Sequence, residues 1–176
     1  MSRVILLVLL ALLYACGEAT APPATAGQEE MAADNVVLTV THLMTTDGVR
    51  RALMYADTAF VYDDSAQMHL RKVRLELYDE AGRKTADLTA DRGRLNTVTR
   101  AMTAIGNVDL TTLQTSRRIQ TEELHFDPQA DRIWSDVNTT MREGGTVING
   151  TGFTADSQMR NVQVTGATGR GLRLRI

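Results

Sequence analysis

The chain has 176 residues, a formal net charge of −2 and 43 % hydrophobic residues, which is enough for one domain with a buried core. Aromatic residues make up only 5 % of the chain, and the basic residues form no long run. Clustered Lys and Arg bind phosphate backbones, and aromatic platforms stack on bases. The composition therefore argues against a nucleic-acid partner.

The N-terminal segment is apolar but short. Arg3 precedes an uninterrupted apolar run over residues 4–13. A membrane-spanning helix needs about 20 apolar residues, so this run is too short to span a bilayer. The pattern predicts a secretory signal peptide over residues 1–15.

The signal ends in Leu13-Tyr14-Ala15-Cys16, which resembles a bacterial lipobox, although Tyr14 stands where a small residue is more usual. Cys16 is the only cysteine and has no disulfide partner within the chain. We predict that Cys16 is lipidated, and acyl chains that bury about 0.8 kcal/mol per methylene would hold the protein on a membrane. An ordinary signal cleaved near Ala15, or a buried free thiol, is the alternative.

Residues 16–34 are rich in Ala, Thr, Pro and Glu and show no hydrophobic period, so we expect a flexible tether. The predicted location is the periplasm, with attachment through Cys16. Gly17 at the next position favours the outer membrane, whereas the function considered below favours the inner membrane.

Residues 35–176 form the predicted folded domain, and apolar and polar side chains alternate along most of it. Alternation is typical of a half-buried β-strand. On the first strand, one face carries Val36, Leu38, Val40, His42 and Met44. Turns are expected at residues 47–48, 63–65, 79–82, 92–100, 127–128 and 144–145, where Asp, Gly, Pro and Ser gather. Asn149-Gly150 predicts either a further turn or a bulge.

A two-part phrase, a short strand and then a second strand after a polar turn, recurs along the chain, and its copies close at Val73, Val108, Val137 and Val162, with steps of 35, 29 and 25 residues. Asp57, Asp91, Asp136 and Asp156 stand at recurring positions of this phrase. Recurrence of this kind indicates stacked supersecondary units that bury a core only together. The intervals are uneven, however. An ordinary meander of hairpins, without a true structural repeat, would show a similar recurrence.

The predicted fold class is all-β, with about a dozen strands and no helix of convincing length. A closed sandwich or barrel fits this pattern, and so does an elongated, slightly open antiparallel roll of stacked hairpins. The recurrence favours the open roll. Each end of such a roll leaves a strand with unpaired backbone groups, to which a partner can add a strand. We expect partner binding at these ends, at Val36, Leu38, Val40, Val162 and Val164.

Several phrases, taken in their order, resemble the LptC family of lipopolysaccharide-export proteins. The resemblance covers about residues 36–165 and rests on the following residues: Ala90-Asp91, Gly106-Asn107-Val108, Leu124-His125-Phe126-Asp127, Trp134-Ser135-Asp136 and Gly150-Thr151-Gly152-Phe153-Thr154-Ala155-Asp156. Familiar members are held by a transmembrane helix, whereas this chain carries a predicted lipid anchor.

The resemblance implies a V-shaped β-jelly roll whose apolar interior holds the acyl chains of lipopolysaccharide. The lipid would arrive from an inner-membrane ABC transporter and leave to a periplasmic bridge protein that joins edge to edge. On this reading the lining is the inward face of the alternating strands: Met54, Ala56, Phe60, Val73, Leu75, Leu88, Ala90, Met102, Ala104, Val108, Leu124, Phe126 and Val137. The small residues leave room, and the methionines adapt their shape. These side chains would equally fill a tight core.

Residue types for catalysis are present but dispersed. His42, His69 and His125 share no motif with each other or with a cysteine, so we expect no zinc site and no cofactor. Asp57, Asp91, Asp136 and Asp156 suit paired acids or calcium ligands, but Asp at the end of a strand more commonly forms a turn. The sequence thus predicts a non-enzymatic lipid carrier. A scaffolding lipoprotein that binds only proteins is the alternative, and a carbohydrate-active solenoid is a distant third.

Overall fold

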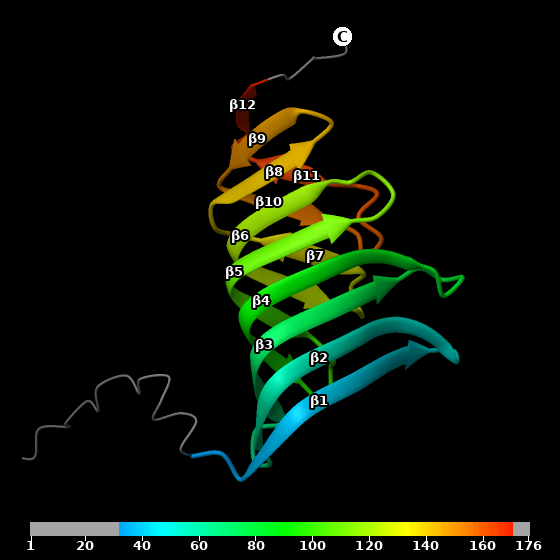
Figure 1. Ribbon diagram of the computed structural model, residues 1–176, viewed down its shortest axis with the longest axis vertical. Coiled ribbons are helices and arrows are strands. Elements are labelled where there is room, and N and C mark those ends of the chain that lie inside the picture. Colours follow the sequence, from blue (N-terminus) through cyan, green and yellow to red (C-terminus); the bar gives the residue numbers. More distant parts are fainter. Residues whose placement is uncertain (1–31, 171–176) are drawn as a thin grey trace, which may run out of the picture. The chain divides into compact units, whose positions relative to one another are not determined.

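The computed structural model describes residues 32–170, and every regular element in this range is a β-strand (Figure 1). The twelve strands are β1 (Asn35–Thr46), β2 (Val49–Tyr62), β3 (Gln67–Tyr78), β4 (Lys84–Asn96), β5 (Met102–Thr112), β6 (Arg118–Asp127), β7 (Arg132–Ser135), β8 (Thr139–Glu143), β9 (Thr146–Gly150), β10 (Gly152–Ala155), β11 (Gln163–Thr165) and β12 (Thr168–Arg170). No helix in the described range could cross a membrane. The predicted all-β class is confirmed.

All strands belong to one antiparallel sheet that does not close on itself. Neighbouring strands follow the order β1-β2-β3-β4-β5-β6-β7-β10-β11, while β8, β9 and β12 form a second branch. The branch starts within β6, because its first residues pair with β8 and its last residues pair with β7. The open roll, rather than a closed barrel, is the architecture of this chain.

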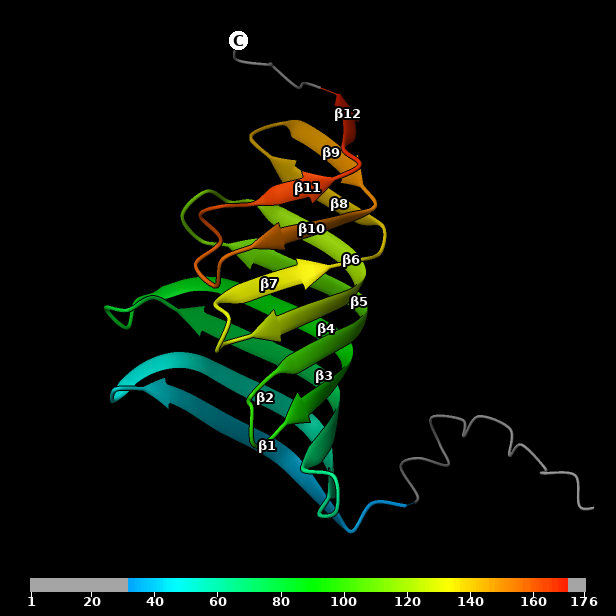
Figure 2. The same cartoon turned by 180° about the vertical axis from the view of Figure 1, so that it is seen from behind.

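The long strands bend in the middle, so the sheet folds into two wings that share most of their strands (Figures 1 and 2). We call wing 1 the part formed by residues 40–56, 73–90, 108–121, 139–150 and 168–170. Wing 2 comprises residues 35–38, 58–71, 92–105, 123–135 and 152–165. Between them lies the bend, where the pairing ladders are interrupted or shift register.

The bend arises from residues whose backbone is left-handed in otherwise extended strands. Thr39, Lys72 and Asn107 have φ values of 54°, 53° and 48°. Such a residue turns the strand and changes which side chains face inward, as a bulge does. In β3, for example, the buried residues are Leu70 and then Val73, so the alternation slips by one residue at the bend.

This slip corrects the sequence prediction for β1 and β2. Phe60 was expected to point inward with Met54, but Ala59 is the buried residue beyond the bend and Phe60 lies on the outer surface of wing 2. Val36 and Leu38 pair with residues of that outer surface, so they do not share a face with Val40. A uniform alternation cannot anticipate these positions, because β1 and β2 contain no Gly or Pro at the bend, whereas β5 has Gly106 there.

Expectations about one turn, about two aspartates and about Val137 are also wrong. Residues 92–100 were expected to form a polar turn, but β4 continues through the bend to Asn96 and the turn is shorter. Asp57 and Asp91 therefore lie within strands rather than at their ends. Val137 was placed on an inward face with Met141, but it lies between β7 and β8 and is 40 % exposed. The expected turns at Asp47-Gly48 and Gly144-Gly145 are confirmed, and all four residues have positive φ.

The core lies between the two wings. Inward side chains of both wings form one hydrophobic cluster, in which Met54, Leu70, Leu88, Leu110, Leu124 and Ile133 are at most 2 % exposed. Because each wing presents its apolar face to the other, neither can bury that face alone. The outer surfaces are mostly polar.

Asn149-Gly150 is neither a turn nor a bulge but part of a crossing from wing 1 to wing 2. The chain leaves β9 at Gly150 and enters β10 at Gly152. A Cβ atom on Gly152 would lie 2.5 Å from the carbonyl oxygen of Ser135, and one on Gly150 would lie 2.6 Å from that of Thr165. Glycine is needed at both positions because backbone from another strand passes so close.

Candidate lipid-binding interior and edge strands

The apolar interior gathers most of the predicted lining residues from both wings. Wing 1 contributes the buried residues Met54, Ala56, Val73, Leu75, Leu88, Ala90 and Val108, and wing 2 contributes Met102, Ala104, Leu124 and Phe126. Alternation within each half-strand places them on one face. Phe60 and Val137 lie outside this interior, for the reason given above. All the other predicted lining residues face one another across the space between the wings.

Within residues 32–170, packed side chains occupy the space between the wings. The buried hydrophobic side chains are no more than 8 % exposed, and they pack against each other. Two small cavities lie where the free margins of the wings approach each other. One, of about 110 Å³, lies among Arg51, Tyr78, Phe126, Pro128 and Ser157, and the other, of about 240 Å³, lies next to Arg117 and Met159. The wings would have to separate along these margins to admit an acyl chain.

Two arginines hold the margins together. Arg100, in the turn between β4 and β5, donates a hydrogen bond of 3.2 Å to the carbonyl oxygen of Thr45. Arg117, before β6, donates at 3.0 Å to the carbonyl oxygen of Met159 and forms a two-pronged ion pair with Glu143 at 2.9 and 3.2 Å. Bidentate Arg–carboxylate pairs fix geometry well. We call this set of contacts the clasp.

Met159 closes the interior from the same side. It lies in the loop between β10 and β11, has a left-handed backbone with φ of 57°, and is only 4 % exposed. Asp156 organises this loop by accepting hydrogen bonds from the backbone N–H groups of Gln158 and Arg160 and from the side chain of Asn161. The clasp could not be predicted from the sequence because it has neither a period nor a motif, whereas the turn at Asp156 was expected.

The outermost strands are exposed at the two ends of the sheet. In β1, Val36 and Leu38 are 56 % and 71 % exposed, while Val40 is partly buried against the core. At the other end, Val162 and Val164 are also partly buried. β1 pairs only with β2, and β11 pairs along its length only with β10. Each therefore has one long side without a strand partner in the described chain.

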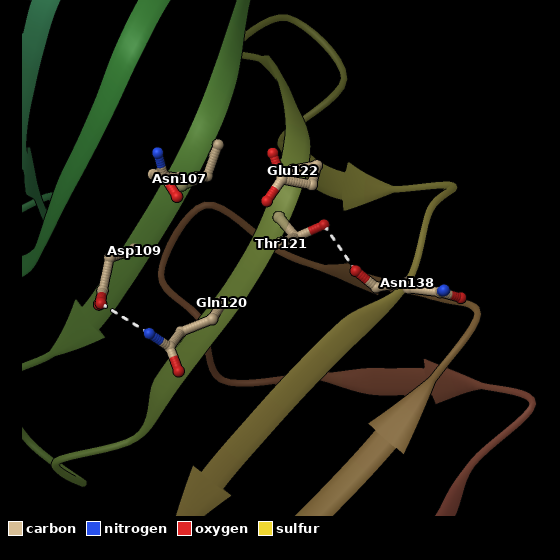
Figure 3. Close-up of a pocket in the computed structure, with 7 residues that line it drawn as sticks. Asn107, Asp109, Gln120, Thr121, Glu122 and Asn138 are labelled. Atoms are coloured by element: carbon tan, nitrogen blue, oxygen red, sulfur yellow. Dashed lines mark hydrogen bonds between the residues drawn. The ribbon is translucent and has the colours of Figure 1, made fainter.

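The outer surface of the bend carries a polar hollow of about 510 Å³ (Figure 3). Its lining includes Asn107, Asp109, Gln120 and Glu122, and Gln120 donates a hydrogen bond of 3.2 Å to Asp109. Hydrogen-bonding side chains of this kind do not suit an acyl chain.

The aspartates of the recurring phrase do not converge on one site. Asp91 accepts a hydrogen bond of 2.7 Å from the amide of Asn107 across the bend, and Asp136 accepts one of 3.1 Å from the indole of Trp134. Of the four, Asp156 forms the expected turn contacts. Within residues 32–170 no group of three potential ligands is close enough to hold a metal ion. His42, expected in the core, is exposed on β1 because no strand covers that end.

The comparisons with known proteins agree with this arrangement. The model of the family "Lipopolysaccharide-assembly, LptC-related" matches residues 3–169. The chain belongs to this LptC-related family. No curated protein matches the sequence. The fold is similar to that of Pseudomonas aeruginosa LptH, described as the LptA-homologous periplasmic component of the lipopolysaccharide transport device. The TM-score is 0.54 at 16 % identity, covering 69 % of this chain and 86 % of LptH.

Membership of the LptC-related family gives the chain a role in periplasmic lipopolysaccharide transport, as a non-enzymatic component. The all-β open roll agrees with the β-jelly roll that the resemblance implied. Asp91, Asp136 and Asp156 have structural hydrogen-bond partners in this roll.

Proposed function

We propose that this protein is a lipid-anchored carrier that binds the acyl chains of lipopolysaccharide between its wings. It receives the lipid from an inner-membrane ABC transporter and passes it to a periplasmic bridge protein. The observation that supports the proposal is a single apolar cluster to which both wings contribute. The free margins of the two wings are joined over this cluster mainly by side-chain contacts. Acyl chains would replace the contacts between the wings with contacts of the same apolar kind.

Covalent lipid labelling at the interior tests this proposal. A photo-crosslinking amino acid at Met102, which is 3 % exposed, is expected to yield lipopolysaccharide adducts in cells. The same amino acid at Arg142, exposed on the outer surface of wing 1, is the matched control and should yield none. Absence of adducts at Met102, or equal yields at both positions, would refute the carrier role.

The filled interior favours a second candidate, a scaffold that holds transport proteins together and never takes up lipid. Its core would remain closed, and only its edges would act. Absence of adducts at Met102 together with intact protein partners would favour this scaffold.

For both the carrier and the scaffold, we propose that a partner protein adds a strand to the exposed edge of β1 or of β11. Proline lacks an N–H group and has a fixed φ, so it disrupts pairing along a strand. Val164→Pro is expected to abolish binding of the bridge protein while leaving thermal unfolding of the roll nearly unchanged, because β11 is short and terminal. Unchanged capture of the bridge protein would contradict docking at this edge.

Attachment through Cys16 remains a prediction, and this residue lies outside the described range. Cys16→Ser should release the protein from membranes and abolish incorporation of a labelled fatty acid. Retention of the label in the variant would contradict lipidation at this cysteine.

A further inference from the structure

The outer surface of wing 2 changes from apolar to basic across four strands. Two rows of cross-strand neighbours define it. The first row runs Val36, Phe60, His69, Arg94, and the second runs Leu38, Thr58, Arg71, Arg92. Leu38 at 71 % and Val36 at 56 % exposure are among the most exposed large apolar side chains in the described chain. We call Val36, Leu38, Phe60, Arg71, Arg92 and Arg94 the wing 2 patch.

The three arginines of the patch lie on neighbouring strands, β3 and β4. Arg71 stands directly opposite Arg92, and like charges at such positions destabilise a sheet. Within residues 32–170, neither Arg92 nor Arg94 forms a hydrogen bond or an ion pair. At the bend, the carboxylate of Asp91 accepts a hydrogen bond from the side-chain amide of Asn107. The guanidinium of Arg71 lies over the ring of Phe60, 5.5 Å from its centroid.

Wing 1 treats its outer charges differently. Lys84 binds Glu76 at 3.0 Å and Asp87 at 2.7 Å, and Arg118 forms an ion pair with Asp109. Lys84 and Arg118 on wing 1 thus have carboxylate partners, and the nearby Arg142 donates a hydrogen bond to the amide oxygen of Gln120. Within residues 32–170, Arg92 and Arg94 have no such partner, so they are available to a ligand.

We propose that the wing 2 patch docks on a membrane surface that contains anionic phospholipids. Exposed apolar side chains next to arginines match the boundary between head groups and acyl chains: the apolar groups enter it, while guanidinium groups bind phosphates. The cross-strand pair Val36–Phe60 supplies the apolar contact with the membrane, and Arg92 with Arg94 supplies the positive charge. This role is separate from lipid binding in the interior, which lies on the opposite face of the same strands.

The start of the folded domain lies beside the patch. The backbone N–H of Asp34 donates a hydrogen bond of 3.0 Å to the carbonyl oxygen of Val61, in the strand that carries Phe60. The segment between Cys16 and the described chain, residues 17–31, reaches at most about 50 Å when fully extended. A lipid on Cys16 would therefore keep wing 2 within reach of the bilayer, although docking does not require it.

Vesicle flotation with the purified full chain tests the proposal. Vesicles of phosphatidylcholine with about a third phosphatidylglycerol are compared with vesicles of phosphatidylcholine alone. The variant Arg92→Gln/Arg94→Gln is expected to partition about tenfold or more weakly than wild type onto the anionic vesicles. Arg118→Gln/Arg142→Gln loses the same charge from the outer surface of wing 1 and is expected to bind like wild type. Any binding through the apolar N-terminal run is common to all variants and cancels.

A second variant tests the apolar part. Leu38→Ser is expected to weaken partition onto both kinds of vesicle, and near-wild-type unfolding temperatures would establish that each variant is folded. Equal partition of all variants would overturn the proposal. Loss of binding to purified lipopolysaccharide micelles, with phospholipid binding intact, would also overturn it, because the patch would then be a lipopolysaccharide site. Adducts at Met102 are unaffected by either result, so this test is distinct from that of the carrier role.

Discussion

At the scale of single residues, charged side chains have three different roles, and the sequence alone does not distinguish them. Arg117 fixes a loop, Arg92 is exposed and has no partner among the described residues, and Lys84 forms a part-buried ion pair with Glu76. The hydrogen bond from the hydroxyl of Tyr78, at 2.7 Å, and then that from Lys84 hold the pKa of Glu76 below its ordinary 4.5. Burial acts to lower the pKa of Lys84, but Asp87 and Glu76 raise it overall.

These shifts predict a loss of stability in acid. A carboxyl whose folded pKa lies below 4.5 stabilises the fold above that pH and loses its contribution as pH falls through the folded pKa. Glu76→Gln should therefore be less stable than wild type at pH 7, and the difference should shrink at about pH 3. Urea unfolding at the two pH values measures this, and a constant difference would contradict the assignment.

At the scale of elements, the bend turns one set of long strands into two layers. Antiparallel strands alone would form a broad sheet with one bare apolar face. Left-handed residues such as Thr39 and Lys72 redirect the strands, and glycines admit the close crossing between β9 and β10. The second layer is thus made from the same strands as the first.

The crossing predicts unequal costs for two glycine substitutions. Gly152→Ala brings a Cβ atom to 2.5 Å from backbone and should destabilise the protein by about 1–3 kcal/mol or more. Gly93→Ala meets only the side-chain ends of Val73 at 3.1 Å and Met102 at 3.2 Å, which can shift. Its cost, measured by thermal unfolding, should be smaller, and equal costs would contradict the role of the crossing.

At the scale of the whole molecule, a carrier must open an interior that is closed here. Separating the wings exposes apolar surface at about 25 cal/mol per Å², so the closed state is strongly favoured until lipid replaces these contacts. The margins join through the clasp and Met159, whereas the bend is continuous backbone. Opening along the margins therefore breaks far less structure than opening at the bend.

Removing the clasp should loosen the margin without unfolding the roll. Arg117→Gln loses the pair with Glu143 and shortens the reach to Met159, at an expected cost of about 1–3 kcal/mol. Amide exchange in residues 156–162 should become faster, and lipid adducts at Met102 should increase. Arg118→Gln, one residue away but paired on the outer surface, is the control and should change neither. Equal amide exchange rates in the two variants would contradict the proposed role of the clasp in closing the margin.

Much of the fold could be predicted from local pattern. Alternation in β3 placed Val73, Leu75 and Leu77 inside, and Asp47-Gly48 marked a hairpin, because both signals depend only on neighbouring residues. The same local signals supported the open roll and most of the interior lining. They failed for Phe60 and Val137, which lie beyond a bend or within it.

The sequence by itself determined most of the strands and, wherever no bend intervened, their inward faces, while the signal and lipobox remain predictions outside the described residues. The tertiary structure alone decided where the strands bend, which margins meet, and that Arg100 and Arg117 join them. The physical reason is range: alternation and turns arise from residues a few positions apart, whereas the clasp and the wing 2 patch unite strands distant along the chain. Only the folded backbone brings Val36 into line with Arg94.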